Sequence, residues 1–228
     1  MIDLPGKAIY DYWFDQSRTP LFVHDTFGPK VEMPVSLYFR QRNQMPLLEK
    51  KALRFCQGKI LDIGAGAGSH ALELQKENKE VSALELSPSA CEVMKNRGVK
   101  RVICNDIFNF SGETFDTLLL LMNGIGLCSD LDGFASFLDH AQKLLSPEGE
   151  LVFDSCDISY MFQEQEKPED YYYGEVSYRY QYGSLFTDWF QWLYLDKATM
   201  QAISSAKGWK IKHLVEDQNH QYLVSLYR

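Results

Sequence analysis

The chain has 228 residues, of which 45% are hydrophobic and 14% aromatic, so it can fill a core and wholesale disorder is excluded. Lys and Arg total 23 against 31 Asp and Glu, a formal net charge of −8, which argues against a general nucleic-acid or anionic-lipid surface. The N-terminal residues lack the basic and apolar regions of a signal peptide, and the longest aliphatic run, Leu118 to Met122, is too short to span a bilayer. We therefore expect a cytoplasmic protein without membrane contacts.

The cysteines are scattered and form no Cys-x-x-Cys pair, so they predict reduced thiols rather than a disulfide framework or a zinc site. They lie at positions 56, 91, 104, 128 and 156.

Residues 1–57 are predicted to form an N-terminal helical cap. An aromatic stretch is followed by a segment, Thr19 to Pro34, that proline and glycine interrupt. Pro46 is expected to open a helix that Gly58 ends.

From residue 58 onward the pattern alternates between short apolar strands and amphipathic helices, which predicts an α/β domain over residues 58–228. The expected strands are at 59–63, 81–86, 101–104, 115–122 and 150–153, with helices at 69–78, 88–97 and 134–145. Ser89 and Glu92 are expected to form a capping box at the start of the second of these helices. Residues 146–149 are expected to turn before the fifth strand, and residues 107–114 are too short for an ordinary helix.

After Asp154 the alternation ends, and residues 158–195 are predicted to be an insert containing a hairpin. Apolar and polar residues alternate from Glu175 to Tyr182, which predicts a strand. A turn is expected at Gly183, followed by a second strand from Leu185 to Leu195. A helix at 197–207 and an antiparallel pair at 209–216 and 221–227 complete a doubly wound, mostly parallel sheet of seven strands.

Eight of the 13 tyrosines lie between Tyr160 and Tyr194. Two interpretations stay open: the hairpin buries aromatic side chains against the body, or it forms an aromatic wall over a substrate. The acidic stretch from Glu164 to Asp170 is predicted to act as a hinge or gate.

A glycine-rich turn carries the clearest chemical signal. Asp62, Gly64, Gly66 and Gly68 lie between the first strand and the following helix. Acidic residues also end the next two strands, at Glu85 and Asp106. Ligands of open α/β sheets bind at the carboxyl ends of strands, so these residues predict a nucleotide or nucleoside site.

The turn fits a dinucleotide poorly. In the fingerprint G-x-G-x-x-G/A, the sixth position counted from Gly64 is Ser69, which fails, whereas counting from Gly66 reaches Ala71, which passes. Asp62 would repel a pyrophosphate but suits an ammonium group. A nicotinamide-dependent oxidoreductase is therefore the weaker alternative.

At these residues the chain resembles the class I, Rossmann-like S-adenosylmethionine (SAM)-dependent methyltransferases, whose pattern is acid-x-Gly-x-Gly-x-Gly followed by acids after the second and third strands. The resemblance implies SAM as cofactor and S-adenosylhomocysteine (SAH) as product. It implies that the glycines line the methionine portion, with Asp62 at its ammonium, Glu85 at the ribose, and Asp106 and Ile107 at the adenine. Asn123 is expected near the methyl donor, and Ala65 and Leu86 complete the cofactor-binding set.

The acceptor is less clear from the sequence, and a small molecule is the prediction. The Asn/Asp-Pro-Pro-aromatic motif of nucleobase and glutamine methyltransferases is replaced by Asn123-Gly124-Ile125-Gly126. Asn123 also replaces the first acid of catechol-type metal sites, and although Asp154 and Asp157 remain, no metal is expected. The acidic balance of the chain predicts no nucleic-acid partner. His24 is the candidate base, with an ordinary loop histidine as the alternative, and no catalytic residue or oligomeric state is assigned. A SAM-binding regulatory protein without turnover remains the second alternative.

Overall fold

The computed structural model of the chain describes residues 2–162 and 166–228. The chain divides into two compact units, each built from separate stretches of sequence. One unit contains Met1–Met45, Leu61–Phe110 and Ser177–Phe190, and the other contains Pro46–Ile60, Ser111–Val176 and Gln191–Arg228.

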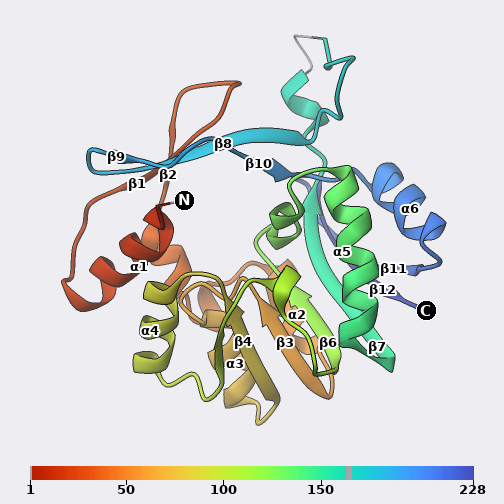
Figure 1. Ribbon diagram of the computed structural model, residues 1–228, viewed down its shortest axis with the longest axis horizontal. Coiled ribbons are helices and arrows are strands. Elements are labelled where there is room, and N and C mark those ends of the chain that lie inside the picture. Colours follow the sequence, from red (N-terminus) through yellow and green to blue (C-terminus); the bar gives the residue numbers. More distant parts are fainter. Residues whose placement is uncertain (1, 163–165) are drawn as a thin grey trace. The chain divides into compact units, whose positions relative to one another are not determined.

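The predicted seven-stranded sheet is present, and its strand order is β11-β12-β7-β6-β3-β4-β5 (Figure 1). The pairs β4–β5 and β6–β7 are parallel, whereas β7–β12 and β11–β12 are antiparallel, which confirms the mostly parallel sheet with a reversed final pair. The strands are β3 (Lys59–Ile63), β4 (Glu80–Glu85), β5 (Val102–Cys104), β6 (Phe115–Leu120), β7 (Leu145–Cys156), β11 (Lys210–Glu216) and β12 (Gln221–Tyr227).

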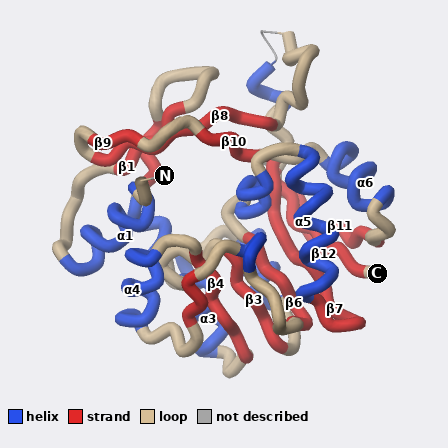
Figure 2. The backbone as a smooth tube through the Cα atoms, in the orientation of Figure 1, coloured by secondary structure: helices blue, strands red, loops and turns tan. Residues whose placement is uncertain are grey.

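Helices alternate with these strands as an α/β fold requires (Figure 2). They are α1 (Leu4–Phe14), α2 (Leu47–Phe55), α3 (Ser69–Lys76), α4 (Pro88–Arg97), α5 (Leu131–Leu144) and α6 (Lys197–Ala206). No helix in the described part of the chain is long and apolar enough to cross a membrane.

The start of α4 differs from the prediction. Ser87 is the N-cap, and its hydroxyl accepts a hydrogen bond from the Ala90 amide at 3.0 Å. The predicted capping box of Ser89 and Glu92 is therefore wrong, because Ser87 already occupies the N-cap position and places both residues inside the helix. Gly98 ends α4 in the left-handed conformation, as expected.

The predicted turn at residues 146–149 is also wrong, because these residues belong to β7. The pairing of β6 with β7 breaks its register here: Phe115 lies opposite Leu145, but Thr117 already lies opposite Glu150. The turn-forming residues are thus accommodated as an irregularity inside a long strand. Residues 107–109 form only a short 3-10 turn, η3 (Ile107–Asn109), as expected for so short a link.

A second, five-stranded sheet was not predicted, and it has the order β10-β8-β1-β2 with β9 paired to β8. Its strands are β1 (Leu21–His24), β2 (Val31–Met33), β8 (Glu175–Tyr182), β9 (Leu185–Phe186) and β10 (Phe190–Leu193). The hairpin of β8 and β9 is confirmed, but its expected second strand is divided into β9 and β10.

The N-terminal segment is therefore not purely helical, since β1 and β2 lie between α1 and α2. Leu21 of β1 lies opposite Tyr182 of β8, and His24 lies opposite Arg179. Leu21 and Tyr182 join a buried cluster with Leu4 and Ile9 of α1. The β8 strand thus supplies part of the core of its unit.

Candidate functional site

The loop that follows β3 contains three glycines in the left-handed region, with φ of 68° at Gly64, 55° at Gly66 and 80° at Gly68. A Cβ atom at Gly66 would lie 2.9 Å from Cδ1 of Tyr38, and one at Gly68 would lie 2.7 Å from Cγ2 of Val99. A Cβ atom at Gly64 would meet nothing within 4 Å. Gly66 and Gly68 therefore permit close packing inside the protein, whereas Gly64 borders open space.

Asp62 lies at the entrance of this loop and is 2% exposed. Its Oδ2 atom is buried and has no hydrogen-bond partner among the described residues. Burial raises the pKa of Asp62 to about 6, although the nearby His70 and the Ala71 amide oppose the rise. A buried carboxylate oxygen without a partner is costly, and a cationic ligand group would remove that cost.

Glu85 ends β4 and reaches back to the glycine loop. Its Oε2 atom accepts a hydrogen bond from the Gly66 amide at 2.8 Å, and Oε1 accepts one from the Ser87 amide at 2.9 Å. Burial raises the pKa of Glu85, and these two amides oppose the rise. Each carboxylate oxygen can accept a second hydrogen bond, so Glu85 can still bind two hydroxyl groups. The adjacent Leu86 is 68% exposed.

Asp106 and Ile107 follow β5. One Asp106 oxygen caps η3 by accepting a hydrogen bond from the Phe108 amide at 3.0 Å. Ile107 is buried, whereas the Phe108 side chain is 42% exposed. Phe108 was not predicted as a site residue, although an aromatic side chain beside a predicted adenine-binding acid is a usable signal.

Tyr38 and Arg97 were also not predicted as site residues, and together they brace the glycine loop. The Tyr38 ring covers Gly66, and its main-chain oxygen accepts a hydrogen bond from the Ser69 hydroxyl at 2.6 Å. Arg97 donates to the main-chain oxygen of Ala67 and, at 3.4 Å, to that of Tyr38. No local sequence pattern reveals these contacts, because α4 brings Arg97 to the loop from a distant part of the chain.

The segment after β6 has a different construction. Met122 and Asn123 take positive φ values of 61° and 54°. The main-chain N–H of Asn123 donates a hydrogen bond to Asp154 Oδ1 at 3.1 Å. The side chain of Asn123 donates to the Leu193 carbonyl at 3.2 Å and accepts from the Ser155 hydroxyl at 3.0 Å. Both polar ends of this side chain are thus used within the protein.

The tyrosines of β8 differ in burial, and Tyr180 packs against the buried cluster that contains Tyr182. Tyr182 is buried and donates a hydrogen bond to Asp11 Oδ2 at 3.1 Å, as a core residue would. Tyr178 and Tyr180 are partly exposed and contact the Phe190 ring, with centroids 6.4 and 5.4 Å apart. Alternation along the strand places all three tyrosines on one face. The predicted acidic gate includes Glu164 and Gln165, which lie outside the described residues.

The remaining candidates have ordinary surroundings. His24 belongs to β1 rather than to a loop, and its Nε2 atom lies 2.8 Å from Gln181 Oε1. Burial raises the pKa of Cys128 and raises that of Cys156 to about 11, so both thiols are protonated at neutral pH. Among the described residues, no group of three or more His, Cys, Asp and Glu side chains is arranged to hold a metal.

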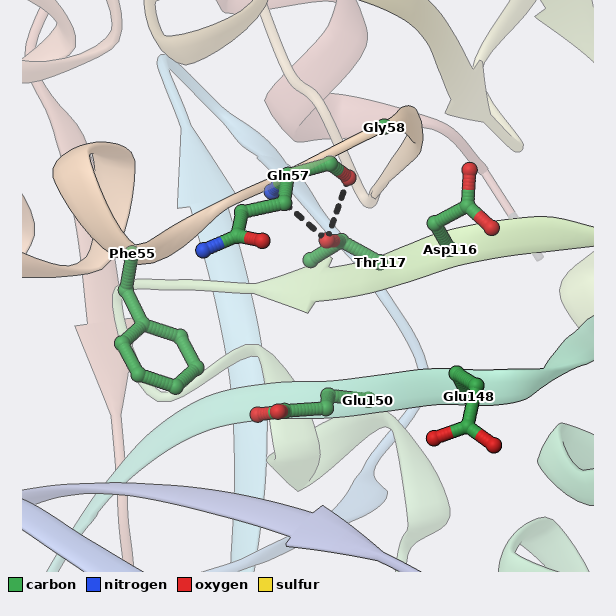
Figure 3. Close-up of a pocket in the computed structure, with 7 residues that line it drawn as sticks. All are labelled: Phe55, Gln57, Gly58, Asp116, Thr117, Glu148 and Glu150. Carbon is green, nitrogen blue, oxygen red and sulfur yellow. Dashed lines mark hydrogen bonds between the residues drawn. The ribbon is translucent and has the colours of Figure 1, made fainter.

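A cavity of about 270 Å³ lies elsewhere, at the amino-terminal ends of β3 and β6 (Figure 3). The Thr117 hydroxyl closes one side by donating to the Gln57 carbonyl at 2.9 Å. Because α/β sheets bind ligands at the opposite, carboxyl ends of their strands, this cavity is not the candidate site. Its lining residues are Phe55, Gln57, Gly58, Asp116, Thr117, Glu148 and Glu150.

The fold and the glycine-rich loop after β3 define a Rossmann-like domain. A family model described as "Methyltransferase domain" matches residues 56–217. A solved SAM-dependent methyltransferase from Bacteroides fragilis, in complex with S-adenosyl-L-homocysteine, is 41% identical, with a TM-score of 0.90 over 98% of this chain and 94% of that one. The chain belongs to the SAM-dependent methyltransferase family, and SAM is its cofactor.

More distant relatives share part of the chain. The biotin biosynthesis bifunctional protein BioHC of Saccharophagus degradans is 27% identical over 115 residues, which cover 47% of this chain and 20% of that protein. The demethylmenaquinone methyltransferase of Tropheryma whipplei is 24% identical over 106 residues, covering 44% and 42%. The matches thus span less than half the length of these curated relatives. The sugar N-methyltransferase KedS8 from Streptoalloteichus shares the fold, with a TM-score of 0.63 at 18% identity over 90% of this chain and 96% of that one.

Proposed function

We propose that the protein transfers the methyl group of SAM to a small-molecule acceptor by in-line displacement. The observation that carries the proposal is the buried, unpartnered Oδ2 atom of Asp62 beside the open space at Gly64. This pair offers a negative charge and room for the ammonium end of methionine. A pyrophosphate would instead bring further negative charge toward a buried carboxylate, which disfavours the nicotinamide alternative.

The proposed donor site uses the predicted residues in their predicted roles, except Asn123, whose side chain is already paired with Leu193 and Ser155. Gly64, Ala65, Gly66 and Gly68 hold the methionine portion through their main chain. Glu85 accepts hydrogen bonds from the ribose hydroxyls through the second lone pairs of its oxygens, and Leu86 flanks that sugar. One Asp106 oxygen accepts from the adenine amine, and Ile107 contacts the ring.

Bound SAM supplies an activated methyl group on a positively charged sulfur. The protein's contribution is to hold donor and acceptor in line, since proximity and orientation account for much of the acceleration of such a step. The rigid loop braced by Tyr38 and Arg97 fits this role, because it fixes the methionine end before the acceptor binds. A general base is needed only for an acceptor that keeps its proton at neutral pH.

A small organic acceptor is proposed from the partly exposed Tyr178 and Tyr180 and their neighbour Phe190. Aromatic faces with hydroxyl tips suit an organic molecule. The formal charge of −8 disfavours a polyanionic nucleic acid. We also propose a cytoplasmic location, a cap at residues 1–57, and a SAM-binding domain at residues 58–228 that includes the insert at 158–195.

The test combines binding with turnover. Calorimetry is expected to show binding of SAM and SAH but not of NADH. Incubation with SAM and a metabolite extract is expected to release SAH and to yield one methylated small molecule by mass spectrometry. Binding of SAM without SAH release in any fraction would instead support the regulatory alternative. Binding of NADH in place of SAM would overturn the proposal.

A further inference from the structure

Two cysteines converge on the main chain of Glu85. Cys91 lies on α4 and is buried, and its thiol donates a hydrogen bond to the Glu85 carbonyl at 3.5 Å. Cys104 ends β5 and is exposed, and it is the register partner of Glu85 in the parallel β4–β5 pair. The amide of the next residue, Asn105, donates to the same Glu85 carbonyl at 3.1 Å. The Glu85 carbonyl oxygen therefore contacts both Cys91 and the residue that follows Cys104.

Cys104 lies close enough to Cys91 to affect its ionisation. Burial raises the pKa of Cys91, and the neighbouring Cys104 adds to the rise. Cys91 consequently remains protonated, whereas the exposed Cys104 is accessible to reagents in solution. Each of the other three cysteines, at positions 56, 128 and 156, is buried.

We propose that Cys91 and Cys104 form an oxidation site that closes to a disulfide in the presence of a hydroperoxide, and that closure weakens SAM binding. All five cysteines are free in the structure, so the reduced pair is the starting state. The convergence of both residues on Glu85 favours a disulfide, because two cysteines that point apart cannot be bridged without backbone movement.

With hydrogen peroxide as the oxidant, the reaction balances in two steps. The Cys104 sulfur attacks one peroxide oxygen, the O–O bond breaks, and Cys104 becomes a sulfenic acid while the other oxygen leaves as water. The Cys91 sulfur then attacks the Cys104 sulfur and displaces the sulfenic oxygen as a second water. Both thiol hydrogens end in water, and two electrons pass from the sulfur atoms to the peroxide. Loss of the Cys104 thiol also removes one cause of the raised Cys91 pKa, which favours the second step.

The effect on SAM follows from the position of the pair, and this part rests on the proposed roles of Glu85 and Asp106. Closure removes the thiol hydrogen bond to the Glu85 carbonyl. It also draws the end of β5 toward α4, two residues before Asp106. The coupling is reciprocal, so bound SAM is expected to slow closure of the disulfide.

The experiment treats the full chain with hydrogen peroxide, with and without saturating SAM. Peptide mapping by mass spectrometry is expected to find a Cys91–Cys104 link in the wild type and in the control C56S, and no link in C91S or C104S. The affinity for SAM by calorimetry is expected to fall about fivefold or more on oxidation. Dithiothreitol is expected to restore it, and C91S is expected to keep its affinity during the same treatment.

Oxidation of Cys104 alone, with Cys91 still free, would overturn the disulfide. A mapped disulfide with unchanged SAM affinity would overturn the coupling to the donor site. If the reduced wild type fails to bind SAM, the proposed donor roles fail, but the peptide map still decides whether the thiols form the bond.

Discussion

The loops after β3 and after β6 each directly follow a strand of the same sheet, yet they are built in opposite ways. The loop after β3 reaches positive φ with glycines, and Asp62, near the end of β3, has an unpartnered carboxylate oxygen. The loop after β6 reaches positive φ with Met122 and Asn123, and Asn123 pairs both polar ends of its side chain within the protein.

The loop after β3 is suited to bind a ligand, whereas the loop after β6 stabilises the fold. An unpaired buried oxygen costs free energy until a ligand group pairs with it, so the first loop gains from binding. The second loop pairs its polar groups already, and the strain of its backbone is held by those hydrogen bonds. Binding and stability should therefore respond differently to changes in the two loops.

The largest effect is expected from Glu85→Ala. Hydrogen bonds to a charged acceptor are worth roughly 1.5–3 kcal/mol each, so loss of two ribose contacts should weaken SAM binding by about a hundredfold or more. Thermal stability should fall as well, because the Gly66 and Ser87 amides lose their acceptor. Calorimetry measures the affinity, with Glu85→Gln as an intermediate control that keeps one oxygen. An unchanged affinity in Glu85→Ala would refute the ribose assignment.

Asn123→Ala should act mainly on stability. It leaves the Leu193 carbonyl and the Ser155 hydroxyl without their partner, at a cost of about 2 kcal/mol in the free energy of unfolding. Chemical denaturation measures this cost, and SAM affinity should change by less than about threefold. Asn123→Gly is the matched control, because glycine removes the same hydrogen bonds but accepts the positive φ. A large loss of SAM affinity at unchanged stability would show that Asn123 binds SAM rather than stabilising the fold.

Two glycine substitutions test the donor loop from within. Both Gly64→Ala and Gly66→Ala place a side chain at positive φ, which costs roughly 1–2 kcal/mol. The added methyl group at Gly66 also displaces the Tyr38 ring, whereas at Gly64 it enters open space. The midpoint temperature of thermal unfolding should therefore fall more in Gly66→Ala. For the same loss of stability, SAM affinity should fall more in Gly64→Ala. Equal losses of both quantities in the two variants would contradict the assignment of Gly64 to the ligand.

A pH dependence from Asp62 needs no substitution and is expected to be absent at neutral pH. Its pKa is about 6 in the folded protein against an ordinary value of 3.8, so it gains a proton as the pH falls through 6. The protonated form cannot pair with an ammonium, and SAM affinity should fall by up to about tenfold per pH unit below 6.

The stability of the free protein should change in the opposite direction. Because the folded pKa is raised, ionised Asp62 destabilises the fold at neutral pH, and the contribution of Asp62 to the stability of the free protein should rise as the pH falls through 6 toward 3.8. Asp62→Asn should flatten the contribution of this residue to both profiles, measured by calorimetry and thermal unfolding. A pH profile of SAM binding that is the same in Asp62→Asn would exclude Asp62 from the ammonium site.

The seven-stranded sheet could be predicted because its signals are local. Short apolar strands, amphipathic helices and stop signals such as Gly98 each extend over a few residues. Two local predictions were wrong. At Ser89, the neighbouring Ser87 caps the helix instead, and at residues 146–149 a register break keeps the turn-forming residues inside a strand. The family could likewise be predicted, since the spacing of Asp62, the glycines, Glu85 and Asp106 depends only on strand and loop length.

The sequence by itself thus determined the α/β alternation, the glycine loop and the acids that follow the strands, because hydrophobic periodicity and turn chemistry are written in consecutive residues. Only the tertiary structure decided that β1 pairs with β8, that Tyr38 and Arg97 brace the glycine loop, and that Cys91 and Cys104 both lie beside Glu85. Each of these contacts joins residues from separate stretches of the chain. Their energy comes from side chains and strand edges that meet only after the chain has folded, so no local pattern records them.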